Sequence, residues 1–159
     1  MASRIRFSVT DSFTPEMDEL RQTFTSNPWP DGTSIDPFDN CSFHILAFVE
    51  NQLAGMVRLS AHPISPLASW VLKPDSLRSG IRIVEATRAV VSPEFRGNGI
   101  YKALMANAVI WAFQHNICGL SVPSSCLSRC FRFFASWDVA TSSNKRGFLT
   151  LPMAKPFVK

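Results

Sequence analysis

The sequence predicts an α/β fold, a mixed central sheet flanked by helices, and three observations lead to this prediction. The chain has 159 residues, of which 46% are hydrophobic and 18% charged. That share of apolar residues is enough for a domain core and argues against disorder along the chain. Segments of alternating or β-branched residues occur between segments of helical spacing, in the order strand, helix, three strands, helix, strand, helix, strand. We therefore expect residues 1–159 to form one domain.

Charge and cysteine usage exclude several function classes. The net charge is +4, and the basic residues are scattered, so we expect no nucleic-acid interface. The cysteines form no C-x-x-C pair and no zinc-binding spacing, so we expect no metal site. We expect the thiols to be buried and reduced, as in a cytoplasmic protein. The N-terminal MASRIRFSVT has no apolar run after its arginines, and no stretch reaches about 18 apolar residues. We expect neither a secretory signal nor a membrane span.

A strand and a helix are predicted at the start of the chain. Residues 4–10 alternate weakly and are expected to form the strand. Thr14-Pro15-Glu16 is typical of a helix start, with a hydroxyl cap, a proline in the first turn and an acid facing the helix dipole. The helix is expected to end before Asn27-Pro28, because proline restricts the residue before it. Residues 27–42, rich in Pro and Asp, are expected to be an irregular loop.

Three strands are predicted next. Residues 43–50 and 53–60 are expected to form a hairpin with a tight turn at Asn51-Gln52. Residues 81–91 are rich in β-branched residues and form the clearest strand of the sequence, which Pro93 ends.

The second half is predicted to alternate helices and strands. Residues 100–115 are apolar almost all round, which predicts a helix covered on most sides. A short strand at 117–122, an aromatic-rich helix at 125–137 and a closing strand at 147–151 are expected to follow.

The segment Arg96-Gly97-Asn98-Gly99 lies between the clearest strand and the apolar helix. Glycines let successive backbone N–H groups turn toward one point, and the helix N-terminus behind them adds partial positive charge. Such an arrangement suits a pyrophosphate. The alternative is an ordinary glycine turn before a helix.

The run VVSPEFRGNGIYKALM resembles the acyl-CoA-binding segment of the GNAT acyltransferase superfamily, whose loop is R/Q-x-x-G-x-G/A. Arg96 and Gly99 match this motif, and Tyr101 stands at its last position. The resemblance implies the GNAT fold, no metal, and direct attack of an amine on an acyl thioester carried by CoA or by an acyl-carrier protein. It also implies the residues that bind this donor: Val90, Val91, Arg96, Gly97, Asn98, Gly99, Ile100 and Tyr101.

A spaced set of residues upstream is similar to the autoinducer (acyl-homoserine-lactone) synthases of the same superfamily. The set comprises Arg21, Phe24, Trp29, Asp36-Pro37-Phe38-Asp39, Gly55-Met56-Val57-Arg58-Leu59 and Glu85-Ala86-Thr87-Arg88. The resemblance implies an N-acyltransferase with Glu85 and Arg88 as catalytic residues. Its acceptor site would comprise Trp29, Asp36, Asp39 and Arg58.

Glu85 has apolar neighbours in its strand, so we expect a partly buried carboxylate. Burial raises a carboxyl pKa, which suits a base for an ammonium nucleophile. The alternative is a structural ion pair with an arginine. Strict alternation places Glu85 and Arg88 on opposite faces, so they pair only if a bulge intervenes.

Asp36 and Asp39 either bind a cationic acceptor or serve the turn chemistry common for Asp beside Pro. Arg21 and Arg58 are expected to pair with them and hold the loop, which would make the arginines a scaffold. The three histidines are isolated in the sequence and are expected to be edge or capping residues. Aromatic residues either line a tunnel for a fatty acyl chain or pack in the core; they are Trp70, Trp111, Phe113, Phe131, Phe133, Phe134 and Trp137.

The predicted function is therefore transfer of an acyl group to a primary amine. The aromatic content favours a fatty acyl group. The acceptor is an amino acid, a metabolite similar to S-adenosylmethionine, or a Lys or ornithine side chain of a peptide. The alternative is a non-catalytic acyl-CoA sensor or partner-binding module.

Overall fold

The computed structural model describes residues 4–23, 34–60, 83–115, 119–123, 140–141 and 148–152. The chain divides into two compact units, one of residues 1–59 with 88–108 and one of residues 60–87 with 109–159. The helix predicted at 125–137 lies outside the described residues.

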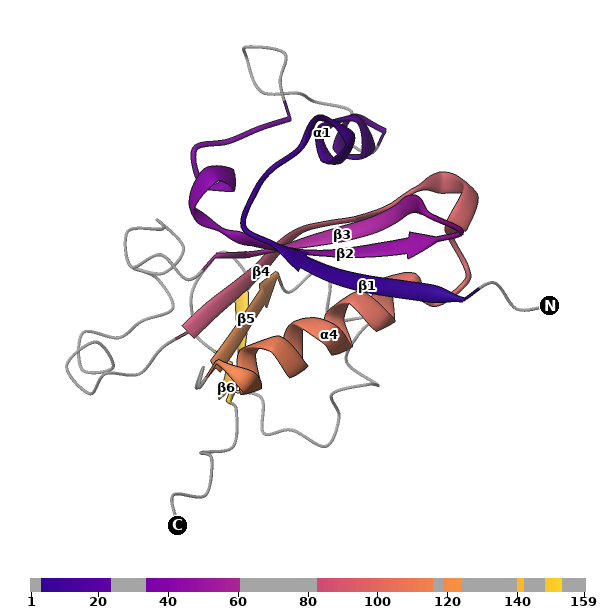
Figure 1. Ribbon diagram of the computed structural model, residues 1–159. Helices are drawn as coiled ribbons and strands as arrows, with labels where there is room; N and C mark the ends of the chain where they lie inside the picture. The colour runs from indigo at the N-terminus through magenta and orange to yellow at the C-terminus, as the bar shows by residue number, and fades with distance from the viewer. Residues whose placement is uncertain are drawn as a thin grey trace. The chain divides into compact units, whose positions relative to one another are not determined.

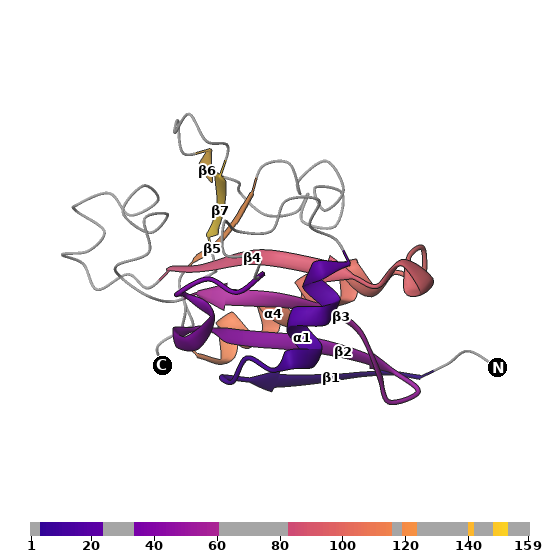
Figure 2. The ribbon, with the colours of Figure 1, turned by 90° about the horizontal axis from the view of Figure 1, so that it is seen from above.

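The first unit contains four neighbouring strands in the order β1-β2-β3-β4, with helices on both faces. Antiparallel strands β1 (Ile5–Thr10), β2 (Phe43–Val49) and β3 (Gln52–Ser60) are followed by the second half of β4 (Ile83–Val91). Helix α1 (Pro15–Gln22) covers one face, and the first part of α4 (Ile100–Gln114) covers the other (Figures 1 and 2). Two short 3-10 turns, η1 (Asp39–Cys41) and η2 (Pro93–Phe95), complete this unit.

In the second unit the first half of β4 pairs in parallel with β5 (Gly119–Pro123). Strand β7 (Phe148–Pro152) is antiparallel to β5 and pairs with β6 (Ala140–Thr141). Parallel and antiparallel pairs thus occur together, which confirms the predicted mixed sheet. The predicted strand at 117–122 is β5, displaced toward the C-terminus, and the closing strand at 147–151 is β7.

Helix α1 begins as its sequence predicts. The Thr14 hydroxyl accepts the Met17 N–H at 3.4 Å, and Pro15 occupies the first turn. The last helical residue is Gln22, which lies before Asn27-Pro28 as predicted. Thr23 is the C-cap: its N–H donates to the Glu19 carbonyl and its hydroxyl to the Leu20 carbonyl. Residues 24–33 lie outside the described residues.

The hairpin turn lies one residue earlier than predicted. Its two central residues are Glu50, with φ of 48°, and Asn51, with φ of 70°. Positive φ at both central positions is the requirement of a type I′ turn, whose twist matches that of the flanking strands. Val49 consequently pairs with Gln52, which belongs to β3.

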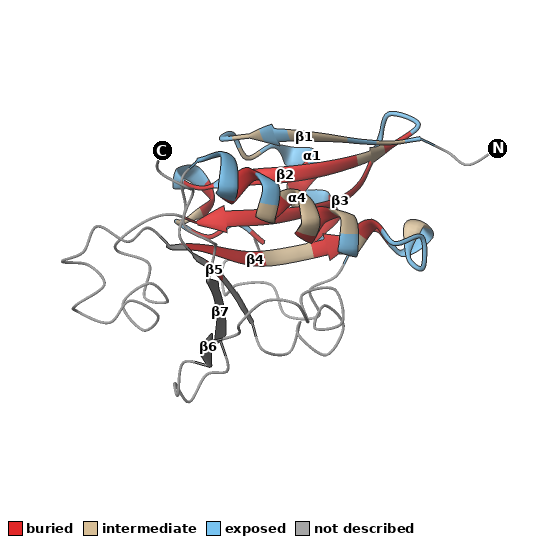
Figure 3. Ribbon diagram, turned by 90° about the horizontal axis from the view of Figure 1, so that it is seen from below, coloured by how far each residue is buried: buried red, intermediate tan, exposed pale blue. Residues whose placement is uncertain are grey.

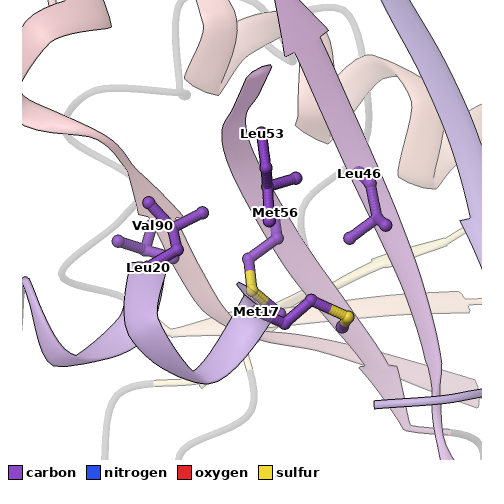
Figure 4. Packing of buried hydrophobic residues seen from close by; sticks show 6 residues of the cluster. All are labelled: Met17, Leu20, Leu46, Leu53, Met56 and Val90. Carbon is purple, nitrogen blue, oxygen red and sulfur yellow. The ribbon is translucent and has the colours of Figure 1, made fainter. Parts of the chain in front are cut away.

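A bulge in β3 organises the core beneath α1. Ala47 pairs with Gly55 and Phe48 with Leu53, which leaves Ala54 as the extra residue. Because of this extra residue, Leu53 and Met56 reach the same face although they are three positions apart. They form a buried cluster, labelled in Figure 4, of Met17, Leu20, Leu46, Leu53, Met56 and Val90. Figure 3 shows buried residues along both β2 and β3, as expected for strands covered on both faces.

The prediction of buried thiols is wrong for Cys41, which is exposed at the end of η1 and carries a free thiol. The other three cysteines lie outside the described residues. In the described part of the chain, no helix is long and apolar enough to cross a membrane.

Gly55 is required where β3 approaches β4 and α4. A Cβ at this position would lie 3.0 Å from the Val90 carbonyl oxygen, 3.1 Å from Ile100 Cγ2 and 3.2 Å from Leu104 Cδ1. We expect Gly55→Ala to lower the free energy of unfolding by about 1–3 kcal/mol, since overpacking displaces neighbouring atoms. Urea unfolding followed by circular dichroism measures this change. A loss below about 0.5 kcal/mol, the scale of an ordinary surface substitution, would contradict the close approach.

Candidate functional site

A buried ion pair joins helix α1 to turn η1 in the first unit. Arg21 Nη1 donates to Asp39 Oδ2 at 2.7 Å, and Arg21 Nη2 donates to Asp39 Oδ1 at 2.8 Å. The exposed side-chain fractions are 2% for Arg21 and 0% for Asp39. Two parallel N–H···O bonds fix both the distance and the plane of the two groups.

The same carboxylate extends the pair into a network across β3 and β4. Arg58 Nη1 donates to Asp39 Oδ1 at 3.1 Å and to Asp36 Oδ1 at 2.6 Å. Arg88 Nη2 in turn donates to Asp36 Oδ2 at 3.1 Å. We call Arg21, Asp36, Asp39, Arg58 and Arg88 the ion-pair network. All five members belong to the first unit, and they come from α1, the loop before β2, β3 and β4.

The loop that carries the two aspartates is also held by its own backbone. The Asp36 N–H donates to Asp39 Oδ2 at 2.8 Å, and the Phe38 N–H donates to Asp36 Oδ1 at 2.9 Å. The Asp39 N–H donates to the Asp36 carbonyl at 3.0 Å. Both carboxylates thus combine the predicted turn chemistry with the predicted arginine pairs. These contacts favour a scaffold role for Asp39, Arg21 and Arg58.

The arginines stabilise the charged form of Asp39. Burial by itself raises the pKa of this carboxyl, but its hydrogen bonds from Arg21 and from the Asp36 N–H, with the charges of Arg21 and Arg58, outweigh burial and lower the pKa. Asp39 therefore remains ionised near neutral pH.

Arg88 has an unusual backbone conformation. Its φ is 54°, in the left-handed region that residues with a Cβ seldom adopt. This residue interrupts the regular alternation of β4, which would otherwise place Glu85 and Arg88 on opposite faces. The Arg88 side chain is 27% exposed, the most accessible in the network. Glu85 lies in the second unit, is 2% exposed, and has Ser121 of β5 as its strand partner.

The predicted phosphate loop follows β4. Gly97 has φ of 83° and Gly99 of 76°, and no atom lies within 4 Å of a Cβ built on either. Arg96 Nε donates to the Val91 carbonyl at 3.2 Å. The Ala103 N–H donates to the Gly99 carbonyl at 3.0 Å, so the loop leads directly into the N-terminus of α4, where the backbone N–H groups carry partial positive charge. Open space and N–H donors together suit a phosphate group.

The structure brings together four predicted site residues and leaves others aside. Asp36, Asp39, Arg58 and Arg88 contact one another, whereas Trp29 and Phe24 lie outside the described residues. Of the aromatic set, Trp111 is buried and stacks on His115 at 4.2 Å, and Phe113 is exposed. The remaining aromatic residues of that set also lie outside the described part.

Sequence reasoning missed the role of His44. The prediction for His44 is an edge or capping residue, whereas the structure shows it fully buried, with Nε2 3.1 Å from the Asp39 carbonyl oxygen. The available signal was strand alternation, which places His44 on the same face as Leu46 in the core under α1. His115, by contrast, is exposed after α4 and its Nδ1 contacts the Trp111 carbonyl at 2.8 Å, as expected of a capping residue.

Residues 14–125 match the sequence profile of the acetyltransferase (GNAT) family. The chain belongs to this family. The GNAT fold and the acyltransferase class predicted from sequence are thus confirmed. No curated protein sequence matches the chain.

Solved structures share the GNAT fold at low sequence identity. The acyl-homoserine-lactone synthase LasI has a TM-score of 0.68 at 18% identity, over 97% of this chain and 93% of LasI. The CoA-dependent synthase BjaI, solved with S-adenosylmethionine and isopentyl-CoA, has a TM-score of 0.63 at 19% identity, over 87% of this chain and 75% of BjaI. An acyl-CoA N-acyltransferase from Pseudomonas aeruginosa has a TM-score of 0.62 at 17% identity, over 95% of this chain and 100% of that one.

Asp39→Asn tests the network of this GNAT domain. The substitution preserves shape but leaves the buried Arg21 without its counter-charge, so we expect a loss of about 3–5 kcal/mol in the free energy of unfolding. Chemical denaturation at pH 7 measures it. Asp11→Asn, at an exposed carboxylate outside the network, is the control and should change stability by less than about 0.5 kcal/mol. Equal effects of the two substitutions would refute the importance of the pair.

The pH dependence of stability has two windows. Burial, the largest cause, and the charges of Arg21 and Arg58 lower the pKa of His44, although its bond to the Asp39 carbonyl and the Asp39 charge oppose this. As the pH falls, the His44 imidazole therefore binds a proton in the unfolded chain before it does so in the folded one. The contribution of a neutral His44 to the free energy of unfolding is complete above about pH 6.5. It falls, by up to about 1.4 kcal/mol per pH unit, as the pH drops toward the lowered pKa. Asp39 adds stability that is full above about pH 4 and is lost below it.

Unfolding free energies measured from pH 3 to 8 test both windows. His44→Gln should remove the pH dependence of stability below about pH 6.5 and leave the one below about pH 4. Asp39→Asn should remove the dependence below about pH 4 and leave the one below about pH 6.5. An unchanged slope between pH 5 and 6.5 in His44→Gln would contradict the assignment.

Proposed function

We propose that this GNAT domain transfers an acyl group from a CoA thioester to a primary amine. The observation that carries the proposal is the open glycine loop between β4 and α4, because its space and N–H donors suit the pyrophosphate of CoA. An acyl-carrier protein that presents the same pantetheine arm is the other donor. The donor site would comprise Val90, Val91 and the loop from Arg96 to Tyr101.

The acceptor is a primary amine on an amino acid, a metabolite similar to S-adenosylmethionine, or a peptide Lys or ornithine side chain. The synthases LasI and BjaI, which share the fold, support this class of acceptor. Asp39 and Arg58 would act on the acceptor indirectly, since their charged groups already bind each other in the network. Asp36 and the partly exposed Arg88, together with Trp29, would form the side that faces it.

In the proposed reaction the amine nitrogen attacks the thioester carbonyl carbon, an N–C bond forms and the C–S bond breaks. Glu85 accepts the proton that the ammonium loses, directly or through water. After the attack the nitrogen loses its second proton to solvent. The sulfur leaves as thiolate and takes a proton from solvent, which is tolerable because the pKa of a thiol is about 8.5. Backbone N–H groups near the irregular residue Arg88 would stabilise the developing oxyanion.

The acyl group is proposed to be a fatty one, on the strength of the aromatic content alone. The protein is proposed to be a single cytoplasmic domain.

The second candidate is an acyl-CoA sensor without turnover. It is favoured by the internal pairing of both network carboxylates, which leaves them engaged before any acceptor arrives.

A thiol-release assay with acyl-CoAs from acetyl to palmitoyl and a panel of primary amines tests the proposal. Wild type should release CoA only when an amine is present, and Glu85→Gln should lower turnover by at least about 100-fold, the scale of general-base catalysis. Glu19→Gln, at an exposed position of α1, is the matched control.

Unchanged turnover in Glu85→Gln would remove the proposed base. Mass spectrometry of ligands that remain bound through purification distinguishes the rivals. Acyl-CoA retained without turnover on any amine would establish the sensor, and retention of acetyl-CoA alone would contradict the fatty-acyl preference.

A further inference from the structure

His44 is a buried polar residue for which the proposed reaction has no direct use. It lies on β2, opposite Thr10 of β1 and Arg58 of β3, and its side chain is fully buried. Its ring also packs on Phe13, at 5.4 Å between centroids, and the Arg21 guanidinium lies 4.6 Å from the centre of the same phenyl ring. Nothing in the GNAT resemblance assigns a role to this position.

The hydrogen bond of His44 determines its tautomer. A backbone carbonyl only accepts, so the Nε2 atom 3.1 Å from the Asp39 carbonyl oxygen must carry the proton. In the neutral ring Nδ1 is then an acceptor. This atom is buried and has no hydrogen-bond partner among the described residues.

A second proton on His44 would be unfavourable for geometric reasons. The new Nδ1–H would have no acceptor in the described part of the chain. The charged groups that face the ring are Arg21 from α1, Asp39 from η1 and Arg58 from β3, while β1 contributes the uncharged Thr10. Two cations and one anion therefore surround a ring that would itself become a cation.

We propose that His44 is a positioning residue of the candidate site, a neutral donor that holds η1 against the sheet through the Asp39 carbonyl. Asp39 is the residue of η1 whose carboxylate binds Arg21 and Arg58, so its backbone position determines where that carboxylate lies. Arg58 and the backbone of the same loop then place Asp36, which binds Arg88. His44 thus acts, through Asp39 and Asp36, on the residues proposed to face the amine acceptor. This part of the inference rests on the proposed function.

The phosphate loop provides an internal contrast. Two of its side-chain hydrogen bonds, from Arg96 Nε to the Val91 carbonyl and from Asn98 to the Phe95 carbonyl, go to backbone of the adjoining segment. Loss of the His44 bond should therefore weaken use of the amine and leave acyl-CoA binding unchanged.

The decisive variants are His44→Phe, which keeps an aromatic ring and removes the donor, and His44→Gln, whose amide nitrogen can donate from nearly the same place. His115→Gln, at the exposed histidine, is the control for loss of a histidine. His44→Phe should raise the KM for the amine about five- to tenfold, the effect of one lost buried hydrogen bond, with an unchanged Kd for acyl-CoA. His44→Gln should restore the KM to within about twofold of wild type.

Two nuclear magnetic resonance measurements make the test independent of turnover. Imidazole spectra of wild type should show the Nε2–H tautomer. Hydrogen exchange at the Asp36 and Phe38 amides, which donate to the two carboxylates, should be about tenfold faster in His44→Phe and unchanged in His44→Gln.

The Nδ1–H tautomer, or unchanged exchange in His44→Phe, would overturn the positioning role. If no amine is acylated by wild type while both spectroscopic results hold, the proposed function fails and the positioning of η1 stands. If His44→Phe does not fold, two measurements still test the positioning role: the tautomer of His44 in wild type and the amide exchange rates in His44→Gln. Slower or faster exchange at Asp36 and Phe38 in His44→Gln would contradict the inference.

Discussion

The bidentate pair between Arg21 and Asp39 is the interaction on which the first unit depends. Two charges that lose water lose several kcal/mol of hydration each, and the loss is offset only when the partners and their remaining lone pairs are satisfied. Asp39 meets this condition with two donors from Arg21, one from Arg58 and one from the Asp36 backbone. Helix α1, the loop before β2 and strand β3 must therefore keep one arrangement. A shift of any of them would leave a buried charge without its partner.

Two irregular strands, β3 and β4, hold the stretch of chain from Arg88 to Ser92. The extra residue of β3, Ala54, exposes its carbonyl to the Ser92 N–H at 2.9 Å, and the next residue, Gly55, lets the Val90 carbonyl approach. Arg88, left-handed and bound to Asp36, lies four residues before Ser92. The short stretch from Arg88 to Ser92 is thus held at one end by the ion-pair network and at the other by the bulge. The 3-10 turn η2 follows this stretch, and the glycine loop begins after η2, at Arg96. The ion-pair network therefore includes a residue of β4, and the candidate phosphate site lies in the segment that follows this strand.

The sequence was sufficient for features that depend on local chemistry. Thr14-Pro15 begins α1, and the glycines of the loop adopt positive φ. The aspartate–arginine pairs join segments at least 18 residues apart and were predicted from opposite charge, without any local spacing rule. Features that depend on another segment were not predictable in this way. The type I′ turn lies at Glu50-Asn51, one residue earlier than predicted, because both strands must pair in register. Strand alternation indicates the burial of His44, but its bond to the Asp39 carbonyl depends on the conformation of η1.

The charge count of the network explains why a histidine suits position 44. Three arginines and two aspartates give the described network a net charge of +1, since 3 minus 2 leaves one cation in excess. A lysine or arginine at position 44 could donate to the Asp39 carbonyl, but it would add a further cation beside Arg21 and Arg58. A hydroxyl is too short to span from a strand to the turn in the place of an imidazole ring. A neutral imidazole supplies a donor, an aromatic surface for Phe13 and no charge, so the properties required at this buried position follow from the ions around it.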